Sequence, residues 1–383
     1  MKSYLDNSAT TALDPRVLKK MLPYLKDRFA NASSIHHPGQ ENNLKLEECR
    51  QRMAGIFRLE SAGMIFTASA SEANNLILRG IMHANRNKGK HLLVSVIEHP
   101  SVIQTARALE KEGYECGFIS VDGEGRIDLS ALSKMIRKDT VLVSVMAVNN
   151  EIGTIQDLKK ISEIVHAKGV LFHSDIVQAI PYLKLDFSKL GLDAASASAH
   201  KFYGPKGAGF AYVKPGIACD PLITGGEQEN GRRAGTYNLP GIVGMAEALC
   251  FAYASRDKEL KQVKDLRDYF WKRLKAEIPD IKLNGGLRHR SPNNLNVRFG
   301  RIEGEAILID LSTKGVCVST GSACSAHNLK SSSVLKAIGL EDYDLNSNIR
   351  FSFGRYNSKK ELDYTVGALK KTVKRLREFT PVG

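Results

Sequence analysis

Several features that would point to a particular class of protein are missing from this chain of 383 residues. Its six cysteines form no Cys-x-x-Cys pair, which argues against a zinc site or a dithiol redox motif of that kind. The most apolar helical stretch, residues 241–254, is too short to span a bilayer and contains Glu247. The N-terminus lacks the apolar core of a signal peptide. We therefore expect no membrane association, reduced thiols and a cytoplasmic location.

The formal net charge of +14 raises the question of a nucleic-acid or other acidic partner. The basic residues are spread along the chain, with local concentrations such as residues 370–375. No interleaved aromatic and basic pattern marks a groove for a nucleic-acid strand. We interpret the charge as general surface character and expect no direct nucleic-acid binding. A non-catalytic basic binding protein stays an alternative.

The middle of the chain alternates short apolar runs with helical stretches. The apolar runs that predict strands are residues 64–67, 91–97, 141–148, 170–173 and 209–213. Near-continuous apolar strands separated by helices are typical of a mostly parallel sheet covered on both faces. The predicted fold class is therefore α/β.

The later part of the chain has a different pattern. A helical run covers roughly residues 240–278, and residues 294–299 and 349–353 alternate like strands of a smaller sheet. We expect a large domain of residues 14–255. Residues 1–13 and 256–383 would form a smaller α+β domain.

Polar residues of unusual kinds follow the predicted strands where each one ends. They are Ser71, His99, Asn150, Asp175 with Gln178, and Ser198 with His200 and Lys201. Ligands of such sheets bind beyond the carboxyl ends of the strands. Taken singly, Ser71 could be only a helix cap, His99 a cap or a core residue, and Asp175 a turn former. Five strand ends that share this chemistry favour a functional site.

Lys201 follows a run of Ala and Ser and precedes a Gly-Pro-Lys-Gly turn. Loss of hydration on a tight loop favours the neutral amine, which can form a Schiff base. Pyridoxal phosphate (PLP) needs such a lysine, a carboxylate at its ring nitrogen, a group on the ring face and donors for its phosphate. Asp175, His99 and Ser71 can supply the last three. Arg350 is a candidate for a substrate carboxylate, although an exposed strand residue is its simpler interpretation.

Longer motifs run along nearly the whole chain. They are Ser196-x-Ser-Ala-His-Lys-Phe-x-Gly-Pro-Lys-Gly207 and residues 4–11, 71–75, 98–100, 149–154, 173–178, 225–228, 231–236 and 349–352. Together they resemble the motifs of the cysteine desulfurases, PLP enzymes of fold type I in the class V aminotransferase group. The resemblance implies the fold of that group.

The resemblance also implies a role for each matching position near the ring. Lys201 would hold the cofactor and move protons. His99 would stack on the ring and act as acid or base. Asp175 would pair with the pyridinium nitrogen, and Gln178 would contact the phenolic oxygen.

Further roles implied by the resemblance concern the phosphate and the substrate. The phosphate would be held by Ala70, Ser71, Ser198, His200 and, from the second subunit of a homodimer, Thr236. Asn150 would help to seat the substrate and the cofactor. Arg350 would bind the carboxylate of the substrate, L-cysteine.

Cys324 lies among Gly, Ser, Ala and Asn, a composition typical of an exposed, mobile loop. An accessible thiol has a reference pKa of about 8.5 and ionises near neutral pH when positive charge is close. In the family the cysteine at this position attacks the sulfur of the cofactor-bound substrate, which gives alanine and a persulfide. Residues 324–333 resemble the longer-loop (IscS/NifS-type) branch. That branch implies a sulfur-acceptor protein, such as an iron–sulfur scaffold or a tRNA-thiolation carrier.

The sequence departs from the family pattern in the phosphate turn. Ser69 stands where Gly is usual, and its Cβ puts the geometry of that turn in question. Ser71 replaces Thr and keeps the hydroxyl, while Ser174 and Ile176 replace the usual neighbours of Asp175. A selenocysteine lyase or another class V lyase on the same scaffold is the alternative enzyme.

Overall fold

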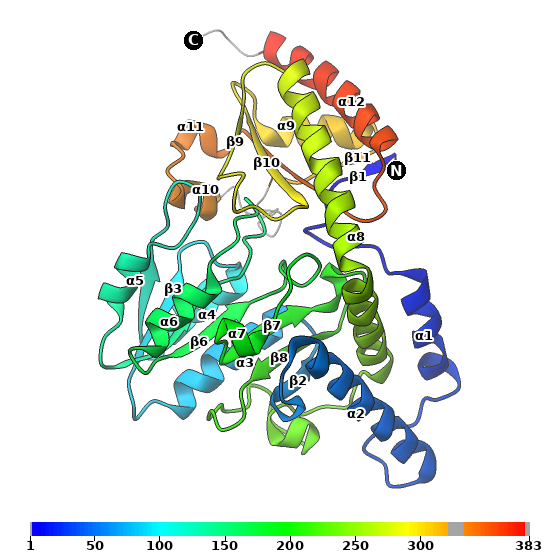
Figure 1. Cartoon of the computed structure of the whole chain (residues 1–383), viewed down its shortest axis with the longest axis vertical. Coiled ribbons are helices and arrows are strands. Elements are labelled where there is room, and N and C mark those ends of the chain that lie inside the picture. The colour runs from blue at the N-terminus through cyan, green and yellow to red at the C-terminus, as the bar shows by residue number, and fades with distance from the viewer. Residues whose placement is uncertain (1, 321–331, 380–383) are drawn as a thin grey trace.

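A seven-stranded sheet forms the larger part of the computed structural model, which describes residues 2–320 and 332–379 (Figure 1). The strand order is β2-β8-β7-β6-β5-β3-β4. Strand β8 pairs antiparallel with both β2 and β7, while the other four pairs are parallel. The predicted mostly parallel sheet is therefore confirmed. The strands are β2 (Met64–Thr67), β3 (His91–Ser95), β4 (Glu115–Ile119), β5 (Thr140–Ser144), β6 (Leu171–Asp175), β7 (Ala194–Ser198) and β8 (Gly209–Val213).

Helices cover both faces of this sheet, and successive strand residues pack into different cores because side chains alternate between the faces. Ile65 and Leu92 pack against α3 and α4, whereas Phe66 and Leu93 pack against the helices of the other face. The first face is covered by α3 (Ala70–Ala84) and α4 (Pro100–Lys111). The second is covered by α1 (Pro15–Lys26), α2 (His37–Phe57), α5 (Leu129–Met135), α6 (Leu158–His166), α7 (Phe187–Leu190) and the first part of α8 (Leu239–Glu277).

The strand-end loops also supply the residues that start the next helices. The His99 side chain caps α4, with Pro100 at the first helical position, and Asp157 caps α6. The cap of α3 is Ser69, whose hydroxyl accepts a hydrogen bond from the Glu72 amide. The prediction that Ser71 caps this helix is therefore wrong. The helix begins at Ala70, one residue before Ser71, and its first turn is small and polar.

A second, smaller assembly lies above the large sheet in Figure 1. It contains an antiparallel sheet in the order β12-β10-β9 and a parallel pair of β1 with β11. Its core packs the second part of α8 against β10, β12, α9 and α12. The elements are β1 (Ser3–Tyr4), β9 (Ile281–Leu283), β10 (Asn294–Phe299), β11 (Val316–Cys317), β12 (Asn348–Ser352), α9 (Gly304–Thr313), α10 (Ser333–Ala337), α11 (Asp342–Leu345) and α12 (Lys359–Glu378).

Helix α8 runs alongside both assemblies without interruption (Figure 1). The predicted boundary at residue 255 falls inside this helix, and the division into two domains stays a prediction. Three short 3₁₀ turns complete the described elements: η1 (Ser61–Gly63), η2 (Ala199–Lys201) and η3 (Gln228–Gly231). Strand β4 was not predicted, because Glu115 and Gly117 interrupt its apolar pattern.

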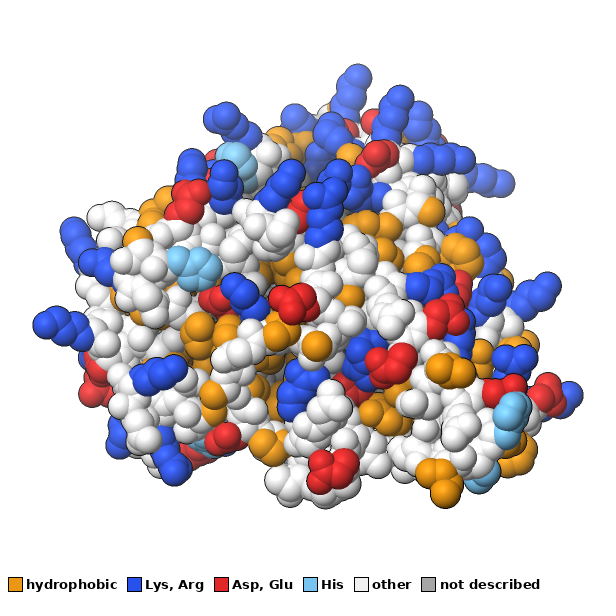
Figure 2. Space-filling model, turned by 60° about the horizontal axis from the view of Figure 1, so that its bottom comes forward, with side chains coloured by type: hydrophobic (Ala, Val, Ile, Leu, Met, Phe, Trp, Pro, Cys, Tyr) orange, Lys and Arg blue, Asp and Glu red, His pale blue; other side chains and the backbone are white. Residues whose placement is uncertain are grey.

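The described residues contain no helix that is both long and apolar enough to cross a membrane. Within ranges 2–320 and 332–379, no group of three or more His, Cys, Asp or Glu side chains could hold a metal ion. Lys and Arg side chains spread over the face shown in Figure 2 and alternate with acidic ones, with more blue along its upper edge. Basic residues such as Arg137 and Arg273 pair with carboxylates on the surface, as a general surface charge would.

Candidate active site

The polar residues predicted at the strand ends do meet at one edge of the large sheet. Asp175 is the last residue of β6, His99 is the residue before α4, and Lys201 ends the turn that follows β7. The charges of Asp175 and Lys201 both act on the ring of His99. These groups, which are separate in the sequence, therefore share one electrostatic environment.

Lys201 points its amine at the N-terminal segment. Its Nζ donates to the carbonyl oxygens of Ser8 at 2.6 Å and Ala9 at 2.7 Å. The Gln178 side-chain amide donates to the same Ser8 carbonyl at 2.9 Å. Two carbonyl acceptors suit an ammonium group, so Lys201 must exchange these contacts when it bonds to a carbonyl carbon. The N-terminal segment is thus part of the site. Its motif, residues 4–11, did not by itself indicate this role.

Asp175 is buried, with 5% of its surface exposed. Its Oδ1 accepts from the Val177 amide at 3.0 Å, and its Oδ2 accepts from the side-chain amide of Asn74 at 2.9 Å. The contact with Val177 is the turn-forming one that a purely structural interpretation predicts, and it also fixes the carboxylate at the strand end.

The first turn of α3 supplies donors that suit a phosphate. Ala70 and Ser71 are its first two residues, and Ser71 is exposed, so its hydroxyl and these amides can reach a ligand. Ser69 has φ −166°, an extended conformation that any residue adopts, so the departure from Gly causes no backbone strain. The Ser69 hydroxyl accepts a hydrogen bond from the Glu72 amide. Glu72 in turn pairs with Arg233 at 2.8 Å.

The other predicted phosphate residues have different surroundings. Ser198 is buried at the end of β7, and Thr236 is exposed in the segment before α8. His200 Nδ1 lies 3.1 Å from the hydroxyl of Thr10. Burial, with the positive charges of Lys201 and Lys206, lowers the pKa of His200 to about 4. The ring is therefore neutral near pH 7.

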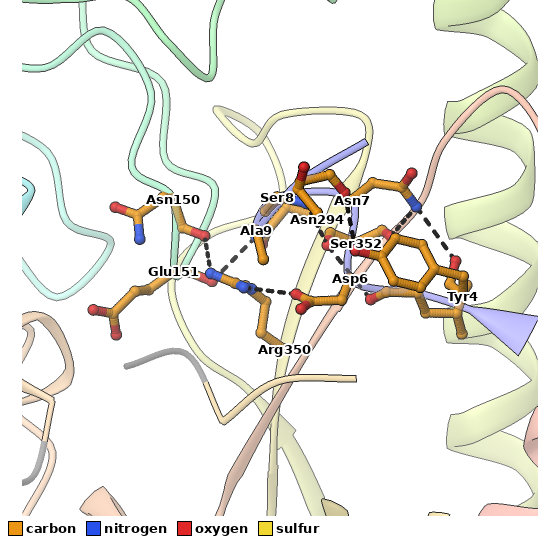
Figure 3. Close-up of polar contacts among 12 residues, drawn as sticks. Tyr4, Asp6, Asn7, Ser8, Ala9, Asn150, Glu151, Asn294, Arg350 and Ser352 are labelled. Carbon is orange, nitrogen blue, oxygen red and sulfur yellow. Dashed lines mark hydrogen bonds and ion pairs between the residues drawn. The ribbon is translucent and has the colours of Figure 1, made fainter. Parts of the chain in front are cut away.

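Arg350 is buried on β12, so its interpretation as an exposed strand residue is wrong. Figure 3 shows its guanidinium between Asp6 and Asn150. Nη2 donates to Asp6 Oδ1 at 2.8 Å and Nη1 donates to the Asn150 carbonyl at 3.0 Å. Its Nε is buried and has no hydrogen-bond partner in the described part of the chain. The side chain thus keeps a donor for a further ligand, and Asp6 orients it.

Cys324 lies outside the described residues. Two described residues that lie near it in the sequence, Ser319 and Ser332, are held beside the site. Ser319 exchanges two backbone hydrogen bonds with Arg350, and the Ser332 hydroxyl donates to Glu151 Oε2 at 2.5 Å. Ser319 is therefore bonded to Arg350 itself, and Ser332 is bonded to the residue after Asn150, whose carbonyl accepts from Arg350.

His99 has a purely structural role as well as the predicted chemical one. Its Nδ1 accepts from the Ser101 amide at 3.1 Å, which is the capping contact of α4. Burial lowers the pKa of His99; the Asp175 charge opposes this shift and the Lys201 charge adds to it. We therefore expect a neutral imidazole at physiological pH.

Together these groups fit PLP by their chemistry. An amine, a buried carboxylate, a neutral ring, and the amides of a 15-residue helix with nearby hydroxyls match the ring, its nitrogen and its phosphate. Residues 3–365 match the model of the family described as Aminotransferase class-V. The chain belongs to this family.

Its relatives narrow the activity. The chain is 44% identical over 378 residues to a protein of Dictyoglomus turgidum named cysteine desulfurase IscS, covering 99% of this chain and 96% of that protein. A protein of the same name from Clostridium botulinum is 40% identical over 381 residues, with 99% and 96% covered. A solved NifS-like protein superposes with a TM-score of 0.93 at 35% identity, covering 98% of this chain and all of that one. The chain is a PLP-dependent cysteine desulfurase of fold type I.

Four residues of the site were missed by reasoning from the sequence. Asp6 and Asn74 lie inside quoted motifs but were given no role, and Ser101 was treated only as the start of a helix. The main-chain carbonyl of Ser8 has no side-chain signal at all. Asn74 did carry a signal, because it is a polar residue on the apolar face of α3 and is fully buried.

Proposed function

We propose that this cysteine desulfurase converts L-cysteine to L-alanine and collects the sulfur as a persulfide on Cys324. The observation that supports this role best is the joint placement of Lys201, Asp175 and Arg350. The first two suit the cofactor, and the third offers a buried guanidinium to an amino-acid carboxylate.

Bound PLP supplies an electron sink that weakens the bonds at the α-carbon of an amino acid. Asp175 would pair its carboxylate with the ring nitrogen and keep that nitrogen protonated. Lys201 would hold the cofactor, and its amine would carry protons at the substrate's α-carbon. The Ser8 and Ala9 carbonyls accept hydrogen bonds from that amine. Ala70, Ser71, Ser198 and His200 would hold the phosphate.

Arg350 would bind the substrate carboxylate and so fix the orientation of the substrate. The Cys324 thiolate forms a bond to the substrate sulfur, and the carbon–sulfur bond of the substrate breaks with its electrons left on carbon. That carbon takes up a proton, which gives alanine, and Cys324 keeps the extra sulfur as a persulfide. No external oxidant or reductant enters this step.

The partners are proposals of the same kind. Thr236 is exposed in this single chain, as a residue that completes the phosphate site of a second subunit would be. A homodimer follows from that assignment, and light scattering tests it. The persulfide would pass to an acceptor protein, such as an iron–sulfur scaffold or a tRNA-thiolation carrier.

The decisive experiment is mass spectrometry of the holoenzyme after incubation with L-cysteine. We expect an added mass of one sulfur on the peptide that contains Cys324. The Cys324→Ala variant should lose sulfide release almost completely and keep the visible absorbance of the cofactor, whereas Lys201→Ala should lose that absorbance. A lyase acting on selenocysteine without a thiol would keep its rate in Cys324→Ala, and that result would refute the proposal.

A further inference from the structure

A continuous chain of hydrogen bonds joins Asp175 to His99 through two residues that have no role in the reaction so far. The Asn74 side-chain amide donates to Asp175 Oδ2 at 2.9 Å and to the Ser101 hydroxyl oxygen at 2.8 Å. The Ser101 hydroxyl lies 2.8 Å from His99 Nδ1. Asn74 is fully buried between α3 and the sheet.

The direction of every bond in this chain follows from its first member. The Asp175 carboxylate accepts only, so the NH₂ of Asn74 must face it. The same NH₂ faces the Ser101 oxygen, which therefore acts as an acceptor there and is left to donate its own proton. Its remaining close neighbour is His99 Nδ1.

The backbone confirms this direction at His99. The Ser101 amide also donates to Nδ1, at 3.1 Å, so Nδ1 must offer a lone pair. In a neutral imidazole the single proton then sits on Nε2. Two independent donors of Ser101 thus select the same tautomer.

The other side of Asn74 is fixed as well. Its oxygen accepts from the Ser196 hydroxyl. The Ser196 oxygen lies 3.3 Å from His173 Nε2, and His173 Nδ1 lies 2.9 Å from the Ser144 hydroxyl. Ser144, His173 and Ser196 are fully buried on neighbouring strands of the sheet. This buried row prevents the amide of Asn74 from turning over.

We propose that Asn74 and Ser101 are positioning residues that hold His99 as the neutral Nε2–H tautomer. The chemical role of His99 rests on the proposed function, while its tautomer does not. In this state the ring presents a proton donor at Nε2 to the reacting groups. It can gain a second proton only at Nδ1, where both Ser101 donors would first have to leave.

The charged groups that face His99 agree with this assignment. Asp175 from β6 favours the protonated ring, whereas Lys201 from η2 disfavours it, and burial disfavours it most. The carboxylate therefore acts on His99 in two ways. Its charge favours the imidazolium, and its hydrogen bonds through Asn74 oppose protonation at Nδ1.

The tautomer can be read directly by NMR of protein labelled with ¹⁵N-histidine, with the cofactor bound and after its removal. His99→Gln identifies the His99 signals among the ten histidines. We expect a protonated Nε2 and a bare Nδ1 in both forms. Finding the proton of the neutral His99 ring on Nδ1 in either form would overturn the proposal.

Variants separate positioning from simple structural support. Ser101→Ala removes the hydroxyl but keeps the capping amide, and should raise the pKa of His99 by about half to one pH unit. Asn74→Ala should shift that pKa in the same direction, and Ser101→Thr should restore it. The matched control is Thr105→Val, because Thr105 carries a buried hydroxyl on the same helix that donates to the Ser101 carbonyl and, among the described residues, makes no other side-chain hydrogen bond. If the pKa of His99 in Ser101→Ala equals its pKa in the control, the proposed role of the hydrogen-bond chain from Asp175 to His99 is refuted.

The tautomer and the pKa of His99 can both be measured without enzyme turnover. If no persulfide is found while the His99 tautomer and its pKa shifts are as expected, the proposed function is wrong and the role of Asn74 and Ser101 stands. If the persulfide forms but His99 has the same pKa in all variants, the proposed role of Asn74 and Ser101 is wrong and the function stands. In the active enzyme the pH–rate limb assigned to His99 should move with the NMR shift in Ser101→Ala.

Discussion

Loss of the Glu229 carboxylate should be among the most damaging single changes away from the reacting groups. Glu229 is 3% exposed and forms a two-pronged ion pair with Arg50, with Nη1–Oε2 at 2.7 Å and Nη2–Oε1 at 3.0 Å. Oε2 also accepts from the Phe66 amide at 3.2 Å. Glu229 and Asn230 have φ of 52° and 55°, a conformation that non-glycine residues seldom adopt. The ion pair therefore holds a turn that the backbone alone does not favour.

The size of the loss in stability depends on the partners that Arg50 retains after Glu229 is removed. Arg50 is 7% exposed, and without Glu229 its guanidinium keeps the Met64 carbonyl, the Phe66 ring and, among the described residues, a single carboxylate, that of the partly exposed Glu47. Removing one partner of a buried ion pair costs about 3–5 kcal/mol, and we expect this for Glu229→Ala. Glu229→Gln keeps an acceptor and should cost about 2–3 kcal/mol.

Urea unfolding followed by circular dichroism, at one protein concentration and one PLP concentration, measures these values. Glu110→Gln is the matched control. The side chains of Arg107 and Glu110 are 53% and 31% exposed, so their ion pair should contribute about 0–1 kcal/mol to stability. The double variant Arg50→Met/Glu229→Leu should recover most of the loss, since the charged partner that it leaves unpaired, Glu47, is 45% exposed and can be hydrated. If Glu229→Gln unfolds like Glu110→Gln, the reasoning about burial is refuted.

Three further predictions concern protonation, thiol reactivity and the phosphate turn. Burial lowers the pKa of His173 to about 3, so between about pH 6.5 and pH 3 the unfolded chain binds a proton that the folded chain does not. Stability should therefore fall as the pH falls through this window, and His173→Gln should reduce the slope of unfolding free energy by up to about 1.4 kcal/mol per pH unit; an unchanged slope would contradict the assignment. Burial raises the pKa of Cys49 and of Cys219 to about 12, so iodoacetamide mapping of the native protein should find both unmodified while Cys324 reacts first. Ser69→Ala should cost about 1 kcal/mol and Ser69→Gly only a few tenths, with PLP affinity unchanged in Ser69→Gly; equal losses for the two would show that Ser69 does not act as a cap.

The sequence predicted the fold and the main groups of the site because both follow from local patterns. Apolar runs such as residues 64–67 and 209–213 formed the expected strands to the residue. The residues that follow β3, β6 and β7 met at one edge because these three strands run in the same direction. His99, Asp175 and Lys201 could therefore be placed together without any knowledge of side-chain contacts.

What could not be predicted depends on contacts between distant residues. Ser101 lies 27 positions from Asn74, and the two touch only because α3 and α4 pack side by side on the same face of the sheet. The cap of α3 was misplaced because Ser69 and Ser71 are equally good capping residues, and the choice between them depends on backbone geometry. Asp6 had no pattern around it that pointed to Arg350, 344 positions away.

The N-terminal segment explains why the groups of this site hold their positions across two sheets. Lys201 and Asp175 belong to the large sheet, whereas Arg350 belongs to the small one. The segment binds both: the Leu5 carbonyl and the Asp6 carboxylate hold β12 and its arginine, and the Ser8 carbonyl receives Lys201. Because Asp6 and Ser8 are two residues apart, the distance between the lysine and the arginine is set by a few peptide units of a turn, which the Ala9 amide closes by donating to the Asp6 carbonyl. The motif at residues 4–11 therefore serves to fix the amine at a defined distance from the group that binds the substrate carboxylate.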